Sequence, residues 1–340
     1  MIFSLRRDYH YHHFENIPKN IWYELYGENN KTNPETCINC SISISNSECF
    51  VLLSFFHDLA SGAISITTNN IKLLHSECSF NDCKNSYGGS VYVFGQNSVI
   101  QHRCCSLYSQ ASNFGQHSCS YLSYGNFNYF LESCVSSCGQ KEKGYETISC
   151  RYGIINISYS NISNNNVGYN GAAYGIAPFN SIGKVNFCSI CQNHCDYWIL
   201  MHYSNDLPTY YLINSNILNN SQSGTSYDII FCSGIMTISN CSIFGNFGNG
   251  PLIYNNANPL RIENCHIDDL TYYKKTLIHT FNIDSITSYH LFSYFSTNNC
   301  LIPFNPRHRE TVIKQKVKYK EGKYIIHISI PFFEPLLSIK

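Results

Sequence analysis

The chain has 340 residues, of which 13% are charged, and its 22 basic and 22 acidic side chains balance to a formal net charge of zero. This balance argues against a general nucleic-acid-binding protein, which needs an excess of basic side chains. No apolar run is long enough to form a transmembrane segment. No secretory signal is evident either, because Arg6 and Arg7 follow a very short apolar segment.

Residues 1–36 precede the first copy of a phrase that then repeats as far as residue 300. They contain His10, His12 and His13 and an aromatic pair at Trp22 and Tyr23. We interpret this segment as an N-terminal cap, because a stack of β-strands must protect its first open edge from pairing with other chains. An exposed cap also accounts for the three histidines, so no metal site is predicted there.

Between residues 37 and 300 a short phrase returns about every 27 residues. Its clearest copy runs from Ile238 to Asn246, with a cysteine at its centre, and two other copies carry serine instead. Periodicity of this length is the signature of a repeat architecture. The central residues of successive copies are Cys49, Cys78, Cys105, Cys134, Ser160, Cys188, Ser215, Cys241 and Cys265.

Each copy contains two or three short β-strands by its pattern of apolar residues. Met236 and Ile238 precede Cys241 and Ile243 follows it, which is the alternation of a half-buried strand. A second strand often opens with glycine, and no copy contains a helical pattern. A unit of this kind cannot bury its own apolar face, so it must stack on its neighbours. We predict an all-β fold over residues 37–300: a single-stranded parallel β-helix of 8 to 9 coils.

Two interior ladders are expected from this stacking. The cysteines at the repeat position (Cys49, Cys78, Cys105, Cys134, Cys188, Cys241 and Cys265) are predicted to pack on one another as small, buried thiols, in preference to a disulfide framework. Asn165, Asn193, Asn220 and Asn246 recur three residues after an apolar position. Asparagine tolerates the left-handed conformation, so we predict that these four residues form the sharp corners of the coils.

The repeated phrases carry a family resemblance. Gly-Gly-small-apolar and apolar-x-x-Asn resemble the repeats of chlamydial-type polymorphic outer-membrane proteins and of Cys- and Asn-rich surface proteins of parasitic protists, with the best match at Gly88–Val91. The resemblance covers residues 37–290 and implies a right-handed β-helix of the pectin-lyase-like group, a hand that parallel crossovers favour. It also implies a cell-surface or extracellular protein, an expectation that stands against the absence of a signal peptide from this sequence.

The preferred functional hypothesis is a non-enzymatic scaffold for binding or adhesion, with a host or surface protein or a glycan as its partner and no cofactor. Solenoids offer long lateral faces, and tyrosine supplies amphipathic contact area. Tyr92, Tyr174 and Tyr254 occupy comparable places after the glycine phrase and are predicted to form one aromatic stripe. The competing interpretation, at least as well supported by the sequence, is that these rings stack only to stabilise the fold.

A divergent polysaccharide lyase or glycoside hydrolase is the enzymatic alternative, because the pectin-lyase-like fold hosts such enzymes. Its candidate residues are the adjacent Asp268 and Asp269 with the nearby Lys274 and Lys275. The polygalacturonase-like elements Asn-Thr-Asp, Gly-His-Gly and Arg-Ile-Lys are absent from the sequence. Neighbouring residues of a strand also point to opposite faces, so a solvated turn is the favoured interpretation of the acidic pair. A structural or decayed member of an expanded repeat family is the third hypothesis.

Two further motifs are weak. Cys37-x-x-Cys40 and the run of Cys188, Cys191 and Cys195 have spacings seen in zinc sites, but about 150 residues separate them and Cys188 already belongs to the cysteine ladder. Six glycosylation acceptor sequences matter only in a secreted protein. Their asparagines are Asn30, Asn39, Asn156, Asn161, Asn219 and Asn240.

Residues 301–340 form a basic tail outside the repeat. Ile313, Val317 and Tyr319 alternate with lysines, Glu321-Gly322 offers a turn, and residues 324–330 give a return strand. We predict a β-hairpin with one charged face, which would discourage edge-to-edge pairing.

Overall fold

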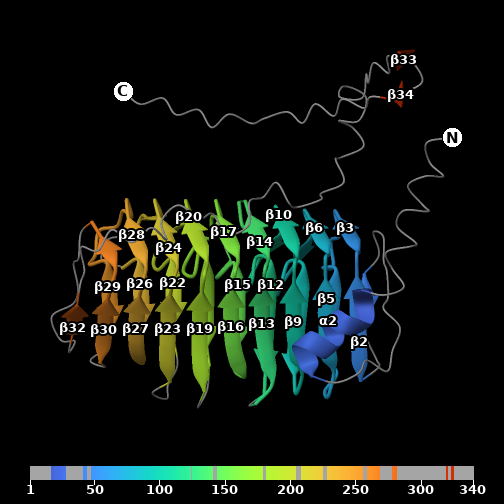
Figure 1. Cartoon of the computed structure of the whole chain (residues 1–340), viewed down its shortest axis with the longest axis horizontal. Coiled ribbons are helices and arrows are strands. Elements are labelled where there is room, and N and C mark those ends of the chain that lie inside the picture. Colours follow the sequence, from blue (N-terminus) through green and yellow to red (C-terminus); the bar gives the residue numbers. More distant parts are fainter. Residues whose placement is uncertain are drawn as a thin grey trace. The chain divides into compact units, whose positions relative to one another are not determined.

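The computed structural model describes residues 17–27, 41–43, 47–123, 125–140, 144–178, 181–203, 208–224, 228–255, 259–268, 278–281, 319–320 and 323–324. The chain separates into two compact units, Met1–Leu301 and Ile302–Lys340. The described part of the first unit is a parallel β-solenoid of about eight turns, as the repeat predicted (Figure 1).

Three parallel sheets run the length of the solenoid, and each coil contributes one strand to each sheet in turn. Sheet A contains β2 (Glu48–Leu52), β5 (Lys72–Ser76), β9 (Ser98–His102), β13 (Phe127–Leu131), β16 (Ile154–Ser158), β19 (Ile182–Asn186), β23 (Thr209–Ile213), β27 (Ile235–Ser239), β30 (Leu260–Glu263) and β32 (Ile278–Phe281). Sheet B contains β3 (Phe55–His57), β6 (Ser79–Asn81), β10 (Cys105–Leu107), β14 (Cys134–Ser136), β17 (Asn161–Ser163), β20 (Ser189–Cys191), β24 (Asn216–Leu218), β28 (Ser242–Phe244) and β31 (His266–Ile267). Sheet C contains β1 (Ile42–Ser43), β4 (Ile64–Ile66), β8 (Val91–Gly95), β12 (Ser118–Leu122), β15 (Ile148–Arg151), β18 (Tyr174–Ala177), β22 (Leu200–His202), β26 (Ile230–Cys232) and β29 (Ile253–Asn255).

We number the coils from the first strand of sheet A, so that coil 1 contains β2, β3 and β4, coil 8 contains β27, β28 and β29, and β30 and β31 open a ninth. Two short pairs lie between sheets B and C: β7 (Lys84–Asn85) with β11 (Gln110–Ala111), and β21 (His194–Cys195) with β25 (Ser221–Gln222). In the second unit, β33 (Tyr319–Lys320) pairs antiparallel with β34 (Lys323–Tyr324). The rest of the predicted hairpin lies outside the described residues and stays a prediction.

Residues in the left-handed conformation turn each coil at two corners. The corner between sheets A and B has positive φ at Leu53, Glu77, Arg103, Glu132, Tyr159, Phe187, Asn214, Asn240 and Asn264. The corner after sheet B has it at Asp58, Asp82, Tyr108, Ser137, Asn164, Gln192, Asn219 and Gly245. The left-handed residue therefore lies one position before each asparagine of the predicted turn ladder. The backbone N–H of these corner residues donates to the next coil, as from Leu53 to Ser76, which offsets part of the cost of a positive φ.

The asparagines of the predicted turn ladder stack inside the solenoid. Asn165 Nδ2 donates to Asn193 Oδ1 at 2.9 Å, Asn193 Nδ2 to Asn220 Oδ1 at 3.0 Å, and Asn220 Nδ2 to Asn246 Oδ1 at 2.9 Å. Each amide group also donates to a backbone carbonyl, for example from Asn193 to Ile162. The side chains therefore satisfy one another along the axis, which explains how amides can occupy a buried row.

The interior is apolar at both ends and polar in coil 3. One cluster of 17 buried apolar side chains extends from Ile42 to Leu122, and a second, of 35, extends from Phe130 to Ile267. Between them, coil 3 turns Gln101, Ser106 and Ser120 inward. In the two neighbouring coils Gln101 pairs with His75 and Phe130, Ser106 with Phe80 and Val135, and Ser120 with Val93 and Cys150. The stack therefore has two apolar cores that meet at a polar layer.

Helix α2 (Ile17–Tyr26) lies across the outer face of sheet A and covers its first strands (Figure 1). Trp22 is fully buried and packs on Phe50 at a centroid distance of 5.9 Å, while Tyr26 Oη donates to the carbonyl of Leu73 at 2.9 Å. The outer row beneath the helix is Phe50, Leu74, Ile100 and Tyr129, and the same row continues as Asn156, Lys184, Tyr211, Thr237 and Arg261. The outer row of sheet A is therefore mostly apolar where helix α2 covers it and mostly polar beyond the helix. The rest of the cap predicted over residues 1–36 lies outside the described residues.

Candidate functional site: an aromatic ladder beside sheet C

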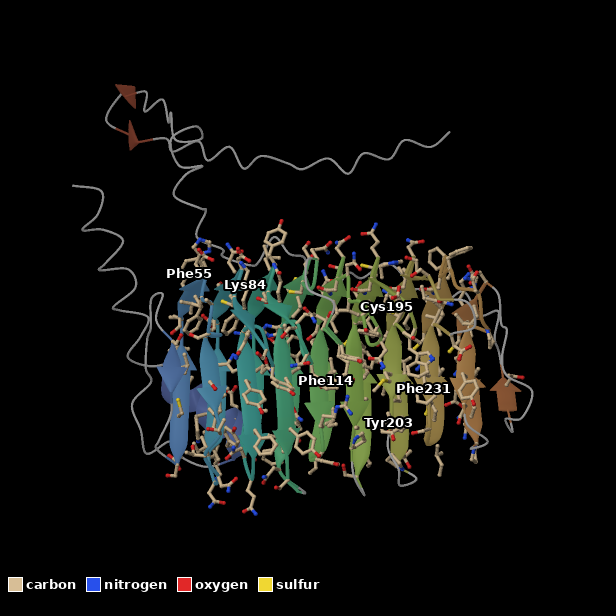
Figure 2. The ribbon with its side chains drawn as sticks, turned by 180° about the vertical axis from the view of Figure 1, so that it is seen from behind. Phe55, Lys84, Phe114, Cys195, Tyr203 and Phe231 are labelled. Carbon is tan, nitrogen blue, oxygen red and sulfur yellow. The ribbon has the colours of Figure 1, made fainter. Side chains whose placement is uncertain are left out.

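Aromatic rings form a continuous series along one side of the solenoid, from coil 2 to coil 8. Successive ring centroids lie 4.3 to 6.4 Å apart, and most neighbouring ring planes are within about 30° of parallel. We call this series the aromatic ladder; its members in spatial order are Tyr92, Tyr87, Phe114, Tyr145, Tyr169, Tyr197, Trp198, Phe231 and Tyr254. Phe114 and Phe231 lie on the same face of the solenoid (Figure 2).

The ladder contains two of the three tyrosines of the predicted stripe. Tyr92 and Tyr254 share one outward-facing row of sheet C with Phe231. Tyr174 does not belong to it, because Tyr174 pairs in register with Ile148 and Leu200, faces inward and is fully buried. Its hydroxyl lies 3.0 Å from His202 Nε2, and burial raises its pKa well above the usual value. The predicted stripe thus confused an inward position with an outward one.

The ladder leaves sheet C in its middle coils because the outward row there contains no aromatic residue and, apart from a methionine, only small ones. Between Tyr92 and Phe231 this row contains Cys119, Ser149, Gly175 and Met201. In these coils the rings come instead from the segments that join sheet B to sheet C. The recess that the small residues leave is occupied by a buried ion pair.

Glu146 and Arg151 form this ion pair. Arg151 Nη2 donates to Glu146 Oε1 at 2.6 Å, and the Glu146 side chain is fully buried while that of Arg151 is 20% exposed. A Cβ atom at Gly175 would lie 2.3 Å from the Glu146 carboxyl group, so only glycine leaves room for it. The Arg151 guanidinium lies 5.2 Å from the ring centre of Phe114. The pair therefore fixes one ring of the ladder from beneath.

Asp228 is a second buried carboxyl group close to the ladder, three residues before Phe231. Its side chain is 4% exposed, and burial raises its pKa to about 7. The carboxyl group therefore changes charge near neutral pH.

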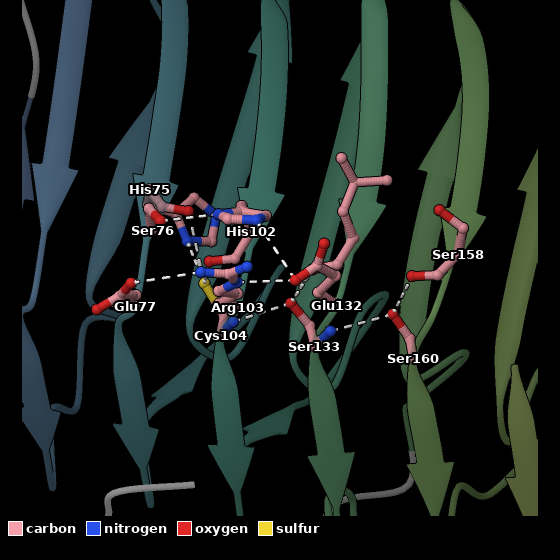
Figure 3. A network of polar contacts seen from close by, with 11 residues as sticks. His75, Ser76, Glu77, His102, Arg103, Cys104, Glu132, Ser133, Ser158 and Ser160 are labelled. Atoms are coloured by element: carbon pink, nitrogen blue, oxygen red, sulfur yellow. Dashed lines mark hydrogen bonds and ion pairs between the residues drawn. The ribbon is translucent and has the colours of Figure 1, made fainter. Parts of the chain in front are cut away.

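At the corner between sheets A and B, each coil places either a serine or a cysteine in one buried row. Its members are Ser54, Cys78, Cys104, Ser133, Ser160, Cys188, Ser215, Cys241 and Cys265. Each side chain donates to the carbonyl oxygen two residues earlier, as from Ser160 to Ser158 at 2.8 Å and from Cys188 to Asn186 at 3.3 Å. Serine also accepts from the previous coil, as from the N–H of Ser133 to Ser160 Oγ (Figure 3). We call this row the Cys/Ser ladder.

Four of the seven cysteines predicted for this row occupy it: Cys78, Cys188, Cys241 and Cys265. Cys105 and Cys134 lie one residue further on and face outward from sheet B, while Cys49 faces inward from β2. The error arose in coil 3, where Cys104 and Cys105 are adjacent and the inward residue is Ser106. The apolar pattern then favoured the wrong cysteine. Cys105 is also disulfide-bonded, so the prediction of a free thiol is wrong for this residue.

A polar network continues from the Cys/Ser ladder in coils 2 to 4 (Figure 3). His75 Nδ1 lies 3.1 Å from Cys104 Sγ, and His102 Nδ1 lies 2.9 Å from Ser76 Oγ. Arg103 Nε donates to Glu132 Oε2 at 2.7 Å at the solvent-exposed corner. Burial lowers the pKa of His75 and of His117 to about 3, so both imidazoles are neutral in the folded protein at physiological pH.

The remaining candidates do not converge. Asp268 Oδ2 accepts from the N–H of Gly245 at 2.6 Å, and Asp269, Lys274 and Lys275 lie outside the described residues. Cys188 and Cys195 are buried whereas Cys191 is half-buried on sheet B, and no metal-binding cluster occurs among the residues that the structure describes.

The other sequence motifs are placed only in part. Cys37, Cys40, His10, His12, His13, Asn30 and Asn39 lie outside the described residues. Among the other acceptor asparagines, Asn219 is exposed at a corner and Asn240 Nδ2 donates to Asn214. Asn156 and Asn161 are half-buried in β16 and β17.

Comparison with protein-family models, with curated proteins and with solved structures finds no match for this chain. In the described part of the chain, no helix is both long and apolar enough to cross a membrane.

Proposed function

We propose that this protein is a non-enzymatic binding scaffold whose aromatic ladder contacts a partner protein. The observation that carries the proposal is the ladder itself: nine rings in series that remain partly exposed across seven coils. From Tyr92 to Tyr254 there are six steps between coils, or about 29 Å at about 4.8 Å per step. Tyrosine and tryptophan are the residues that most often anchor protein interfaces.

The stacking geometry favours a protein over a glycan. Sugars pack against the open face of an aromatic ring, but in the ladder most faces are covered by the next ring, as between Tyr145 and Tyr169 at 4.6 Å and 11°. What such rings offer is their edges and hydroxyl groups. These suit the mixed apolar and hydrogen-bonding contacts of a protein surface, at a small cost in side-chain entropy.

The test is binding of the purified full-length chain to a protein microarray and a glycan array. Tyr169→Ala removes a ladder ring that is 41% exposed. Tyr159→Ala is the matched control: it removes a ring that is 42% exposed and stacks on Phe187 at 4.9 Å, but at the corner between sheets A and B. We expect protein ligands whose affinity falls at least tenfold with Tyr169→Ala and less than twofold with Tyr159→Ala.

Two outcomes would overturn the proposal: equal losses in the two variants, or binding to glycans alone. Sugar release from acidic polysaccharides would favour the enzymatic alternative. The resemblance to surface proteins extends the proposal to a cell-surface location, which labelling of intact cells with a membrane-impermeant reagent tests.

A further inference from the structure

The Cys/Ser ladder contains neighbouring cysteines at its C-terminal end. Sheet A pairs Ser239 with Glu263 and sheet B pairs Ser242 with His266, so Cys241 and Cys265 lie opposite each other on coils 8 and 9. Adjacent strands are about 4.8 Å apart, which lies within the Cα separation of disulfides, about 4.4 to 6.8 Å. The two thiols are also hydrogen-bonded to each other.

We propose that Cys241 and Cys265 are a disulfide-exchange site, at which a small-molecule disulfide such as oxidised glutathione cross-links coil 8 to coil 9. Cys188, the preceding cysteine of the Cys/Ser ladder, cannot form such a cross-link. It lies between Ser160 and Ser215 and has no neighbouring thiol in its row. Cys241 and Cys265 are both fully buried, so the reaction requires coil 9 to separate from coil 8. Strand β31, the last strand of sheet B that the structure describes, has only two residues, and short elements with few hydrogen bonds open at a low free energy.

The reaction follows ordinary thiol–disulfide exchange. The hydrogen bond from Cys241 lowers the pKa of Cys265, which makes Cys265 the attacking thiolate. It attacks one sulfur of oxidised glutathione, forms a mixed disulfide and expels the first glutathione thiolate. Cys241, as its thiolate, then attacks Cys265 Sγ and expels the second. The two protein thiols lose two electrons and two protons, and two molecules of reduced glutathione are formed.

A second pair serves as an internal comparison. Cys78 and Cys104 are also neighbours in the ladder and hydrogen-bonded to each other, but they lie in coils 2 and 3 and burial raises the pKa of Cys104. His75 also lies 3.1 Å from Cys104 Sγ. This pair lies beside β6 and β10, which have three residues each and pair with a further strand on either side. We therefore expect it to react later than Cys241 and Cys265.

The experiment exposes the full chain to defined ratios of reduced to oxidised glutathione, blocks free thiols with N-ethylmaleimide and maps the peptides by mass spectrometry. The expected result is a Cys241–Cys265 cross-link at ratios that leave Cys188 and the Cys78–Cys104 pair alkylated. Cys241→Ser should fold, because serine occupies the same ladder position at Ser54, Ser133 and Ser215, and should stop at a mixed disulfide on Cys265.

Three results would overturn the proposal. The first is full alkylation of both cysteines under oxidising conditions. The second is earlier oxidation of the Cys78–Cys104 pair. The third is a mixed disulfide in the wild-type chain that never resolves to the cross-link.

Discussion

Coil 3 and coil 7 share one backbone but differ in what they enclose. The inward residues of coil 7 are Tyr210, Leu212, Ile217, Ile230 and Cys232. Those of coil 3 are Val99, Gln101, Ser106, Ser118 and Ser120. In both coils the strands of sheets A, B and C pair in parallel with the strands of the neighbouring coils. Stacking of the main chain is therefore compatible with either interior.

Coil 3 replaces apolar contacts with side-chain hydrogen bonds. His117 Nε2 lies 3.2 Å from Gln101 Oε1, Ser120 Oγ donates to Asn128 at 2.7 Å, and Ser106 Oγ lies 3.0 Å from Ser109 Oγ. Such bonds fix a unique arrangement but add little net stability. Because the first apolar core ends within coil 3 and the second begins in coil 4, we infer that the coils before and after coil 3 differ in stability.

Acid should reveal this difference most strongly. His75 and His117 have a folded pKa of about 3 and an unfolded value near 6.5, so their contribution to stability is complete above pH 6.5 and is lost as the pH falls toward 3. Below pH 6.5 each costs roughly 1.4 kcal/mol per pH unit, or about 5 kcal/mol for the two together at pH 4.5. Urea titrations at several pH values check this. We expect His117→Gln to flatten the dependence, and an unchanged slope would contradict the assignment.

Matched core substitutions compare the two interiors directly. Ile217 in coil 7 and Ser106 in coil 3 occupy the same inward row of sheet B. Ile217→Ala should cost about 3 kcal/mol through lost burial and a residual cavity. Ser106→Ala, which loses one hydrogen bond to Ser109, should cost about 1 kcal/mol. Urea unfolding at pH 7 measures both, and equal losses would mean that the two interiors are energetically alike.

Asp228 should oppose folding at alkaline pH. Burial raises its pKa from 3.8 to about 7. Ionisation of this carboxyl group therefore lowers the free energy of unfolding, fully above pH 7 and not at all below about pH 4. Asp228→Asn should therefore stabilise the protein by roughly 2 kcal/mol at pH 8 and have little effect at pH 4. Thermal unfolding at the two pH values decides the matter; equal effects at both would rule out titration as the cause.

Substitution of serine by cysteine in the Cys/Ser ladder should change the stability of the protein least. Ser160 Oγ donates to Ser158 and accepts from the N–H of Ser133, so Ser160→Ala leaves one buried N–H without its acceptor and should cost about 1 to 2 kcal/mol. Ser160→Cys keeps a side chain of the kind found at Cys188 and should cost less than about 1 kcal/mol. Chemical denaturation of the two variants side by side provides the measurement, and a costlier cysteine than alanine would refute the interchange.

The sequence was sufficient for the architecture because the repeat leaves a periodic record. The spacing of the phrases predicted parallel stacking, about 27 residues per coil and the absence of helices from the repeat. The position of Tyr174 relative to the preceding glycine also predicts that it faces inward. Tyr174 is the third residue after Gly171, just as the inward-facing Val91 is the third residue after Gly88. The error came from comparing residue types without comparing their positions.

Other features leave no periodic record in one sequence. The aromatic ladder changes from sheet C to the adjoining segments and back, so Phe114, Tyr145 and Tyr169 share no fixed offset with Tyr92. Glu146 belongs with Arg151, Gly171 and Gly175 only because the coils stack in this register. The inward Ser106 disrupted the apolar pattern in coil 3, which is why Cys105 was assigned to the cysteine ladder in place of Cys104.

Amide hydrogen exchange of the intact protein at pH 7 and pH 4.5 tests most directly whether one continuous stack contains two cores. Among the described residues, the core that ends within coil 3 has 17 buried apolar side chains and lies beside three histidines whose pKa burial lowers, His75, His102 and His117. The core after coil 3 has 35 and lies beside one such histidine, His202. We predict that at pH 4.5 the strands of coils 1 to 3 lose protection while those of coils 5 to 8 retain it. A uniform loss of protection along all eight coils would contradict the account.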